Sequence, residues 1–124
     1  MKAWTNEELT KIDKAEELDI SSLRSDGTMT KPVTIWVVRV GNDLYVRAVN
    51  GRTGVWFKAT QVRHEGHISA GYVDKDVTFV DADPGIYDQV DAAYRTKYHH
   101  YSKNIVITDL TPQARASTLK LVPR

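Results

Sequence analysis

The chain has 124 residues, a common size for one folded domain, and its 41% hydrophobic and 27% charged residues are typical of globular proteins rather than disordered ones. We therefore expect one domain spanning residues 1–124. The 17 basic and 16 acidic residues are mixed along the sequence and give a formal net charge of +1, which argues against nucleic acid as a partner.

Cysteine is absent, which excludes disulfides, thiolate nucleophiles and cysteine-ligated metal centres. The first eight residues are polar and acidic, and no apolar run approaches the length that spans a membrane. We expect a cytoplasmic protein with no membrane contact.

The N-terminal region predicts a short helix followed by a loop. Thr5 and Glu8 have the spacing of a capping box, and Leu9, Ile12 and Leu18 predict a weakly amphipathic helix as far as about Leu18. Turn-forming residues then dominate 21–31, which we expect to be a loop.

A β-hairpin is predicted over 32–40 and 44–49, with Asn42-Asp43 as its two-residue loop. Alternation of side chains places Val37, Leu44 and Val46 on one face of this hairpin. The other face carries Trp36, Val38, Val40, Tyr45, Arg47 and Val49. Because both faces are largely apolar, the hairpin must be covered on both sides, by a helix, a bound cofactor or a second subunit.

A glycine-rich turn at 50–54 leads into Val55-Trp56-Phe57-Lys58 and a stretch with helical features that ends near Gly66. Residues 67–73 and 77–80 predict a second hairpin around Asp74-Lys75-Asp76.

Asp83-Pro84 has the chemistry of a helix start, and Tyr87, Tyr94, Tyr98 and Tyr101 follow as one stripe of a long helix. Such a stripe indicates core packing or a dimer contact more often than a binding site.

The C-terminal region predicts two closing strands, 105–107 and 118–122, with a short helix at Thr111-Pro112 between them. With the two hairpins, the total is six strands. The expected fold class is α+β, a small antiparallel six-stranded β-barrel with one long and one or two short helices.

Catalytic motifs are missing: the sequence has no nucleophile elbow, phosphate-binding loop or dinucleotide fingerprint. His64 and His67 lie three residues apart, but Gly66 interrupts any shared helical face. The adjacent His99 and His100 would point about a hundred degrees apart on a helix. We therefore expect no metal site.

Aromatic and basic side chains from the first hairpin and the segment after it form the candidate site. Flat aromatic surfaces and fixed positive charges could stack a planar ring and neutralise a phosphate. The set consists of Trp36, Tyr45, Arg47, Trp56, Lys58 and Arg63. The competing interpretation is that Arg47 pairs with an acidic residue of the same chain and serves the structure. Binding of single-stranded nucleic acid by the same residues is disfavoured by the net charge.

The sequence also resembles a known family. The matching residues are Asp26-Gly27-Thr28, Pro32 to Val38, Leu44 to Arg47, Trp56-Phe57-Lys58, Gly66-His67-Ile68, Ala93 to Tyr98 and Ala116 to Leu121. They are similar to bacterial domain of unknown function family 2255 and, more distantly, to split-barrel proteins that bind flavins or deazaflavins. The distant resemblance implies a homodimeric six-stranded barrel with a cofactor cleft between subunits.

In split barrels of this kind, basic and polar residues after the second strand hold the cofactor phosphate. The resemblance places this role on Trp56, Lys58, Arg63 and His64, with Arg47 in the same cleft. The sequence departs from the usual pattern at 59–62, where Ala-Thr-Gln-Val stands in place of an Asn-Leu pair. Our leading hypothesis is a protein that uses FMN or a deazaflavin for redox chemistry on a small organic molecule. The alternative is a non-catalytic small-ligand-binding or interaction module of the same fold, which the departure favours.

Overall fold

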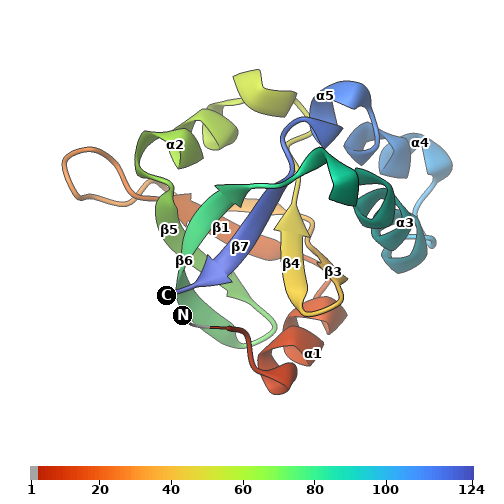
Figure 1. Cartoon of the computed structure of the whole chain (residues 1–124), viewed down its shortest axis with the longest axis horizontal. Helices are drawn as coiled ribbons and strands as arrows, with labels where there is room; N and C mark the ends of the chain where they lie inside the picture. The colour runs from red at the N-terminus through yellow and green to blue at the C-terminus, as the bar shows by residue number, and fades with distance from the viewer. Residues whose placement is uncertain (1–2) are drawn as a thin grey trace.

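The computed structural model describes residues 3–124 and has an α+β architecture, a curled antiparallel sheet with helices around it (Figure 1). The helices of the described part are α1 (Asn6–Lys14), α2 (Val55–Arg63), α3 (Tyr87–Lys97), α4 (Lys103–Val106) and α5 (Pro112–Arg115), with short 3-10 turns η1 (Gly51–Thr53), η2 (Pro84–Ile86) and η3 (Ile107–Asp109). The strands are β1 (Leu18–Ser22), β2 (Val33–Ile35), β3 (Val38–Val40), β4 (Asp43–Val46), β5 (Glu65–Ala70), β6 (Val73–Asp81) and β7 (Leu119–Pro123).

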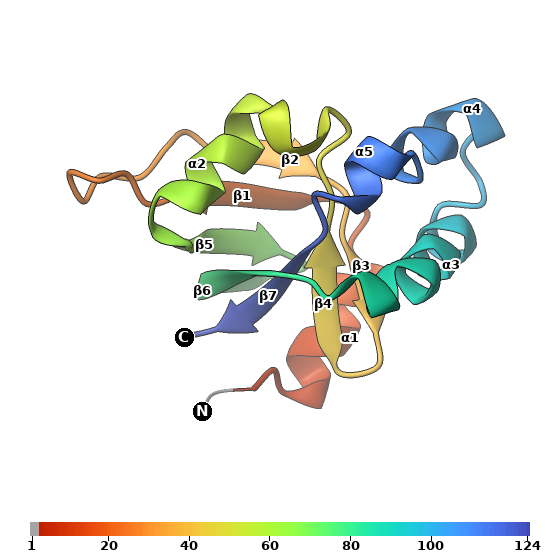
Figure 2. The ribbon, with the colours of Figure 1, turned by 45° about the horizontal axis from the view of Figure 1, so that its top comes forward.

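The sheet curls into a half-barrel. Its strand order is β2-β1-β5-β6-β7-β4-β3, and every pairing is antiparallel. The two edge strands, β2 and β3, are consecutive in the chain and separated only by Trp36 and Val37. Since two residues span only about 7 Å, the sheet must bend until its edges approach each other. Figure 2 shows the strands curving around a common interior.

The expected number of six strands was wrong, because the described residues form seven. The predicted strand 32–40 divides into β2, which pairs with β1, and β3, which pairs with β4. β1 was predicted as helix end and loop, whereas helix α1 ends at Lys14 and Ala15 is already extended. Residues 105–107 are helical instead of a strand, since a three-residue apolar run does not distinguish the two.

The two faces of the first hairpin are confirmed. The loop is Gly41-Asn42, one residue earlier than predicted, but the inward and outward sets are unchanged. Val37, Leu44 and Val46 lie in the barrel core, and Val38 and Tyr45 in a second apolar cluster under α3. Of the three covers considered for the outer face, a helix, a cofactor or a second subunit, the structure shows the helix: α3 of the same chain packs there.

The capping box at the start of α1 is formed as predicted. The Thr5 hydroxyl accepts from the Glu8 amide, and the Glu8 carboxylate accepts from the Thr5 amide at 2.9 Å. The buried residues of helix α1, Leu9 and Ile12, belong to the barrel core and close it at one end.

The second hairpin turns at Gly71-Tyr72, earlier than the predicted Asp74-Lys75-Asp76. Gly71 has φ +56°, and a Cβ there would lie 2.3 Å from the Lys11 carbonyl oxygen. The turn therefore needs glycine both for its backbone conformation and for its close approach to α1.

Asp83 caps the turn η2, which continues into α3. Val90, Tyr94 and Tyr98 are fully buried against the hairpin, and α3 ends at Lys97, with Tyr98 as its C-cap. Tyr94 and Tyr98 are thus core, one of the two interpretations given for the stripe. Tyr87 is only partly buried, and Tyr101 lies beyond the helix, so the four tyrosines do not form one helical stripe.

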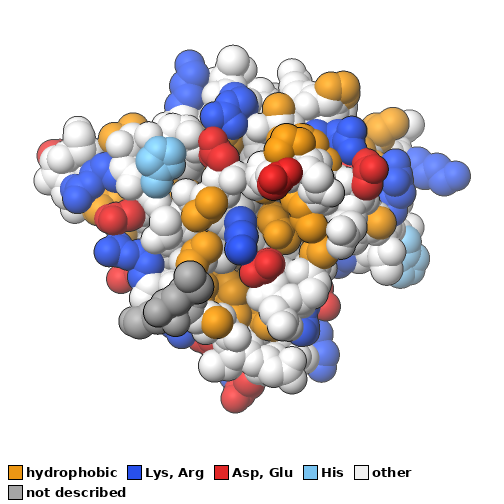
Figure 3. All heavy atoms as spheres, in the orientation of Figure 1, with side chains coloured by type: hydrophobic (Ala, Val, Ile, Leu, Met, Phe, Trp, Pro, Cys, Tyr) orange, Lys and Arg blue, Asp and Glu red, His pale blue; other side chains and the backbone are white. Residues whose placement is uncertain are grey.

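Helices α3, α4 and α5 gather at one end of the sheet, and α2 lies across β1 (Figures 1 and 2). Among residues 3–124, no helix has the length and apolar character needed to cross a membrane. On the face drawn in Figure 3, basic and acidic side chains are interspersed, and neither sign forms a continuous patch.

Candidate functional site

An open groove of about 960 Å³ lies between α2, the edge strand β2 and the helical turns near α4, which is within the usual size of a small-molecule site. It is built from five segments: the end of the β1–β2 loop, β2 with Trp36, residues 47–50, the start of α2, and α4 with η3. Its lining residues include Arg24, Lys31, Trp36, Ala48, Asn50, Trp56, Ile105, Thr108 and Asp109.

Two tryptophans give the groove flat apolar surfaces. The indole of Trp36 stacks on the Tyr98 ring, with centroids 3.8 Å apart and an angle of 5° between the planes. Trp56 comes from the first turn of α2 and packs partly against the barrel core. Both indoles remain partly exposed and line the groove. They are suited to contact a planar ring.

Two basic residues lie at the β1–β2 loop side of the groove. Arg24 is exposed, and its Nη1 donates to the Met29 carbonyl at 2.7 Å and to the Thr28 hydroxyl at 3.2 Å. Lys31 is exposed and forms no ion pair with any residue in 3–124. Together they make this side of the groove positively charged, which suits the binding of a phosphate or carboxylate.

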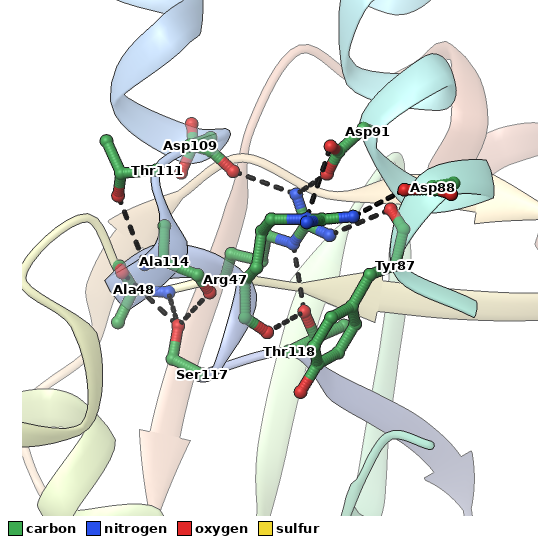
Figure 4. A network of polar contacts seen from close by, with 11 residues as sticks. Arg47, Ala48, Tyr87, Asp88, Asp91, Asp109, Thr111, Ala114, Ser117 and Thr118 are labelled. Atoms are coloured by element: carbon green, nitrogen blue, oxygen red, sulfur yellow. Dashed lines mark hydrogen bonds and ion pairs between the residues drawn. The ribbon is translucent and has the colours of Figure 1, made fainter. Parts of the chain in front are cut away.

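Arg47 lies behind the groove and is bonded to the protein itself (Figure 4). Its Nε donates to Thr118 Oγ1 at 2.9 Å, and Nη2 donates to the Tyr87 carbonyl at 3.1 Å. Its Nη1 donates to Asp91 and, at 2.9 Å, to the carbonyl oxygen of Asp109. The side chain is fully buried, so a phosphate on Arg47 would have to replace one of these partners.

A second arginine continues this network away from the groove. Arg115 forms ion pairs with Asp88 and, at 3.3 Å, with Asp91. Ser117 Oγ accepts from the Ala48 amide at 2.8 Å and donates to the Ala114 carbonyl. These bonds fix residues 47 and 48, which form part of the groove wall, against α3 and the start of β7.

Asp109 is the buried carboxyl group of the groove. It ends η3 and is 5% exposed, and burial raises the pKa of its carboxyl to about 6 despite the nearby Arg47 charge. Arg47 contacts only its backbone oxygen, and no hydrogen bond reaches the carboxylate from residues 3–124. It is a titratable group in a site that can receive a ligand.

The structure brings together three of the residues predicted for the site, Trp36, Arg47 and Trp56. Tyr45 is buried in the cluster under α3, away from the groove. Lys58, Arg63 and His64 are exposed and do not line it. They lie on other faces of α2 and at its C-cap because residues 55–63 wind as a helix.

Sequence reasoning missed Arg24, Lys31 and Asp109. The first two lie in the segment 21–31, where turn-forming composition concealed basic residues next to an edge strand. Asp109 carries no local signal, because its burial results from the packing of η3 against Arg47.

His64 and His67, three residues apart in the sequence, lie in different elements of the fold. His64 caps α2 in the left-handed conformation with φ +56°, and His67 lies in β5 between Asp74 and Asp76. Within residues 3–124, no group of three histidine, aspartate or glutamate side chains could hold a metal ion.

Solved structures of similar architecture include HutZ, described as the heme storage protein from Vibrio cholerae, with a TM-score of 0.65, 12% identity, and coverage of 99% of this chain and 92% of that one. A protein described as an F420 reductase has a TM-score of 0.56 and 14% identity, covering 93% and 90%. An FAD-binding protein from Mesorhizobium loti has a TM-score of 0.59 and 14% identity, covering 99% and 92%. At these identities the likeness concerns the fold, which is similar to that of split-barrel proteins.

None of the curated proteins matches this sequence significantly. A family model does, over residues 8–121, which include β1 to β6, most of β7, α2 to α5 and all the groove residues. The chain therefore belongs to the bacterial family described as "Uncharacterized protein conserved in bacteria (DUF2255)".

Proposed function

We propose that the groove binds a flavin or a deazaflavin, and that the bound ring transfers a hydride or electrons to or from a small organic molecule. One observation carries the proposal: a groove of about 960 Å³ has two indoles on its wall and two basic side chains on one side. The presence of an F420 reductase and an FAD-binding protein among proteins of this fold supports it.

Each groove residue has a distinct role in this proposal. Trp36 and Trp56 contact the ring system, and Lys31 with Arg24 neutralises the phosphate of the cofactor side chain. These two residues take the phosphate role that the sequence suggested for Lys58, Arg63 and His64. The cofactor supplies the redox chemistry when bound, so the protein needs to bind and orient it.

The alternative function is non-catalytic binding of a small ligand by the same groove. It is favoured by the internal bonding of Arg47, which leaves the deepest basic group of the groove occupied by protein oxygens. In this alternative the protein is a sensor or an interaction module.

The homodimer and the cytoplasmic location expected from the sequence belong to the same proposal. Exposed apolar residues surround the groove, among them Val33, Val49, Val55 and Ile105, and a second copy would cover them. Light scattering coupled to size exclusion should give twice the mass of the chain, and a monomer at all concentrations would contradict the dimer.

The first experiment is the visible absorbance of the purified protein, followed by titration with FMN, FAD and a deazaflavin. Bound flavin should quench the fluorescence of Trp36 and Trp56, and Trp56→Leu should weaken binding about tenfold or more. A colourless protein that gives no saturable quenching with any of the three would contradict the proposal.

A matched pair of lysine variants tests where the phosphate binds. Lys31→Ala should weaken FMN binding by about three- to tenfold and leave riboflavin, which lacks the phosphate, unaffected. Lys58→Ala removes the same charge from an exposed site outside the groove and should change neither affinity. If Lys58→Ala weakens FMN binding and Lys31→Ala does not, the phosphate binds at α2 and not at the β1–β2 loop.

A further inference from the structure

The groove contains a carboxylate without a protein hydrogen-bond partner, on a residue that is otherwise buried. Its oxygens are not fully enclosed, since the fully buried side-chain atoms without a hydrogen-bond partner among residues 3–124 are Tyr94 Oη and Arg115 Nε. Only 5% of the surface of Asp109 is exposed, and the residue lines the groove. Figure 4 shows it linked to Arg47 through a single bond, which is made by its backbone oxygen. Its carboxylate accepts no hydrogen bond from residues 3–124.

Protein stability does not account for this carboxylate. Buried carboxylates are normally paired, because an ionised group that loses water without a partner lowers stability. Asp91 follows this rule, since both Arg47 and Arg115 bind it. For Asp109, the groove is a place from which a ligand can supply the missing donor.

The groups that face Asp109 restrict what that ligand can be. Arg47 lies on one side, and the hydroxyls of Tyr94 and Tyr98 lie on the α3 side. Burial raises the pKa values of both hydroxyls, and the charge of Asp109 raises them further. None of them donates to the carboxylate. An incoming group must therefore be a donor, and it must reach Asp109 from a groove whose lining includes the indoles of Trp36 and Trp56.

We propose that Asp109 is the specificity-determining residue of the groove, and that its carboxylate accepts a hydrogen bond from a ring N–H or amino group of a planar heterocycle that contacts Trp36 and Trp56. Flavins and deazaflavins both carry a ring N–H, so the inference deepens the proposed function and rests on the groove being its ligand site. It predicts that flat rings without an N–H donor bind weakly.

The pH dependence follows from the ionisation of Asp109. Its carboxyl has a pKa of about 6 in the unliganded protein, and the ionised form is the stronger acceptor. The affinity for a ring with N–H donors should therefore be highest above pH 7 and fall as the pH is lowered through about 6.

Two small probes test the inference without any flavin. The first, 2-quinolone, carries a ring N–H, and the second, N-methyl-2-quinolone, has the same ring system and no N–H. Both are uncharged at pH 5 and at pH 7.5, so only the protein titrates between the two conditions. Both are titrated into the full chain at pH 7.5 and pH 5, with calorimetry and tryptophan fluorescence as readouts. We expect the first probe to bind about tenfold or more tightly than the second at pH 7.5, and this preference to shrink at pH 5.

Two matched variants complete the experiment. Asp109→Asn keeps the shape and the backbone oxygen that Arg47 binds, and its amide oxygen is a weaker, uncharged acceptor. The preference at pH 7.5 should therefore shrink in this variant and lose its pH dependence. Asp74→Asn makes the same change on the exposed β5–β6 hairpin and should preserve both. Equal affinities in the wild type, no saturable binding of the first probe, or a preference that keeps its size and its pH dependence in a folded Asp109→Asn protein would each overturn the inference.

FMN titration separates this inference from the proposed function. Failure to bind FMN together with a preference that depends on Asp109 would refute the flavin and keep the recognition role of Asp109. Equal binding of FMN by the wild type and Asp109→Asn, without any preference between the probes, would keep the flavin and refute the role of Asp109.

Discussion

Asp91 and Asp109 are both buried and both lie beside Arg47, but their surroundings are opposite. Asp91 is on α3, in a network with two arginines whose remaining donors bind Thr118, Tyr87 and Asp88. Asp109 is at the groove, with no donor on its carboxylate. The comparison indicates that the region between β4 and α3 is held by paired charges, whereas at η3 burial opposes the ionised form of Asp109 without a protein donor to offset it.

The largest expected effect comes from breaking the paired region. Arg47→Met removes one of the two arginine partners of Asp91 and leaves Thr118 and two carbonyls without their donor, so the free energy of unfolding should fall by about 3–5 kcal/mol. Urea denaturation measures the loss. Lys11→Ala, which removes an exposed ion pair with Glu7, should cost less than about 1 kcal/mol.

The same variant separates two roles of Arg47. If the folded Arg47→Met protein keeps its affinity for FMN, Arg47 has a structural role and its assignment to the cofactor site is wrong. A loss of affinity without a loss of stability would restore that assignment.

The second expected effect is a gain in stability, from replacing the unpaired Asp109. The pKa of Asp109 is raised from 3.8 to about 6 by folding, so the folded state retains a proton that the unfolded state has lost between these two values. The free energy of unfolding therefore falls as the pH rises through this window, and the loss is complete above about pH 7. Asp109→Asn should be about 1–3 kcal/mol more stable than the wild type at pH 7.5 and nearly equal to it at pH 4.

Thermal unfolding at both pH values measures this difference. A variant that is less stable than the wild type at pH 7.5 would show that the carboxylate has a stabilising partner after all, and the comparison between the two aspartates would no longer hold.

The smallest effect is expected from removing the hydroxyl of one of two tyrosines, Tyr94 in α3 or Tyr98 at its C-cap. The Tyr98 hydroxyl donates to the Glu16 carbonyl at 2.9 Å and accepts from the Val37 amide at 3.2 Å, whereas the buried Tyr94 hydroxyl has no partner in residues 3–124. Tyr98→Phe should lower stability by about 1–2 kcal/mol, and Tyr94→Phe should be neutral or slightly stabilising. Equal losses in both variants would indicate that Tyr94 has a hydrogen-bond partner.

The hairpin faces could be predicted from the sequence because alternation in a strand survives an error in the turn. Moving the loop from Asn42-Asp43 to Gly41-Asn42 still leaves Val37 facing Leu44 and Val46, and Val38 facing Tyr45. The start of α1 was also predictable, since the Thr5 and Glu8 side chains decide it locally.

The groove was less predictable because its parts meet only after folding. β1 was missed because its alternation ends in two serines, and without β1 the strand at 33–35 has no partner. Trp36 and Trp56 were predicted for the site because they are large flat side chains, and both line the groove. Lys58 was predicted with them, but residues 55–63 form a helix, and this helix places Lys58 on a face that does not line the groove. The burial of Asp109 depends on tertiary contacts that no local pattern encodes.

The shortness of the edge strands β2 and β3 also affects how the protein behaves at high concentration. Each has three residues, and the chain passes directly from one to the other through Trp36 and Val37. A neighbouring molecule that pairs with either edge therefore finds a ladder too short to extend, and exposed edges are the usual starting point of intermolecular β-aggregation. A lengthened β2 or β3 would remove that protection.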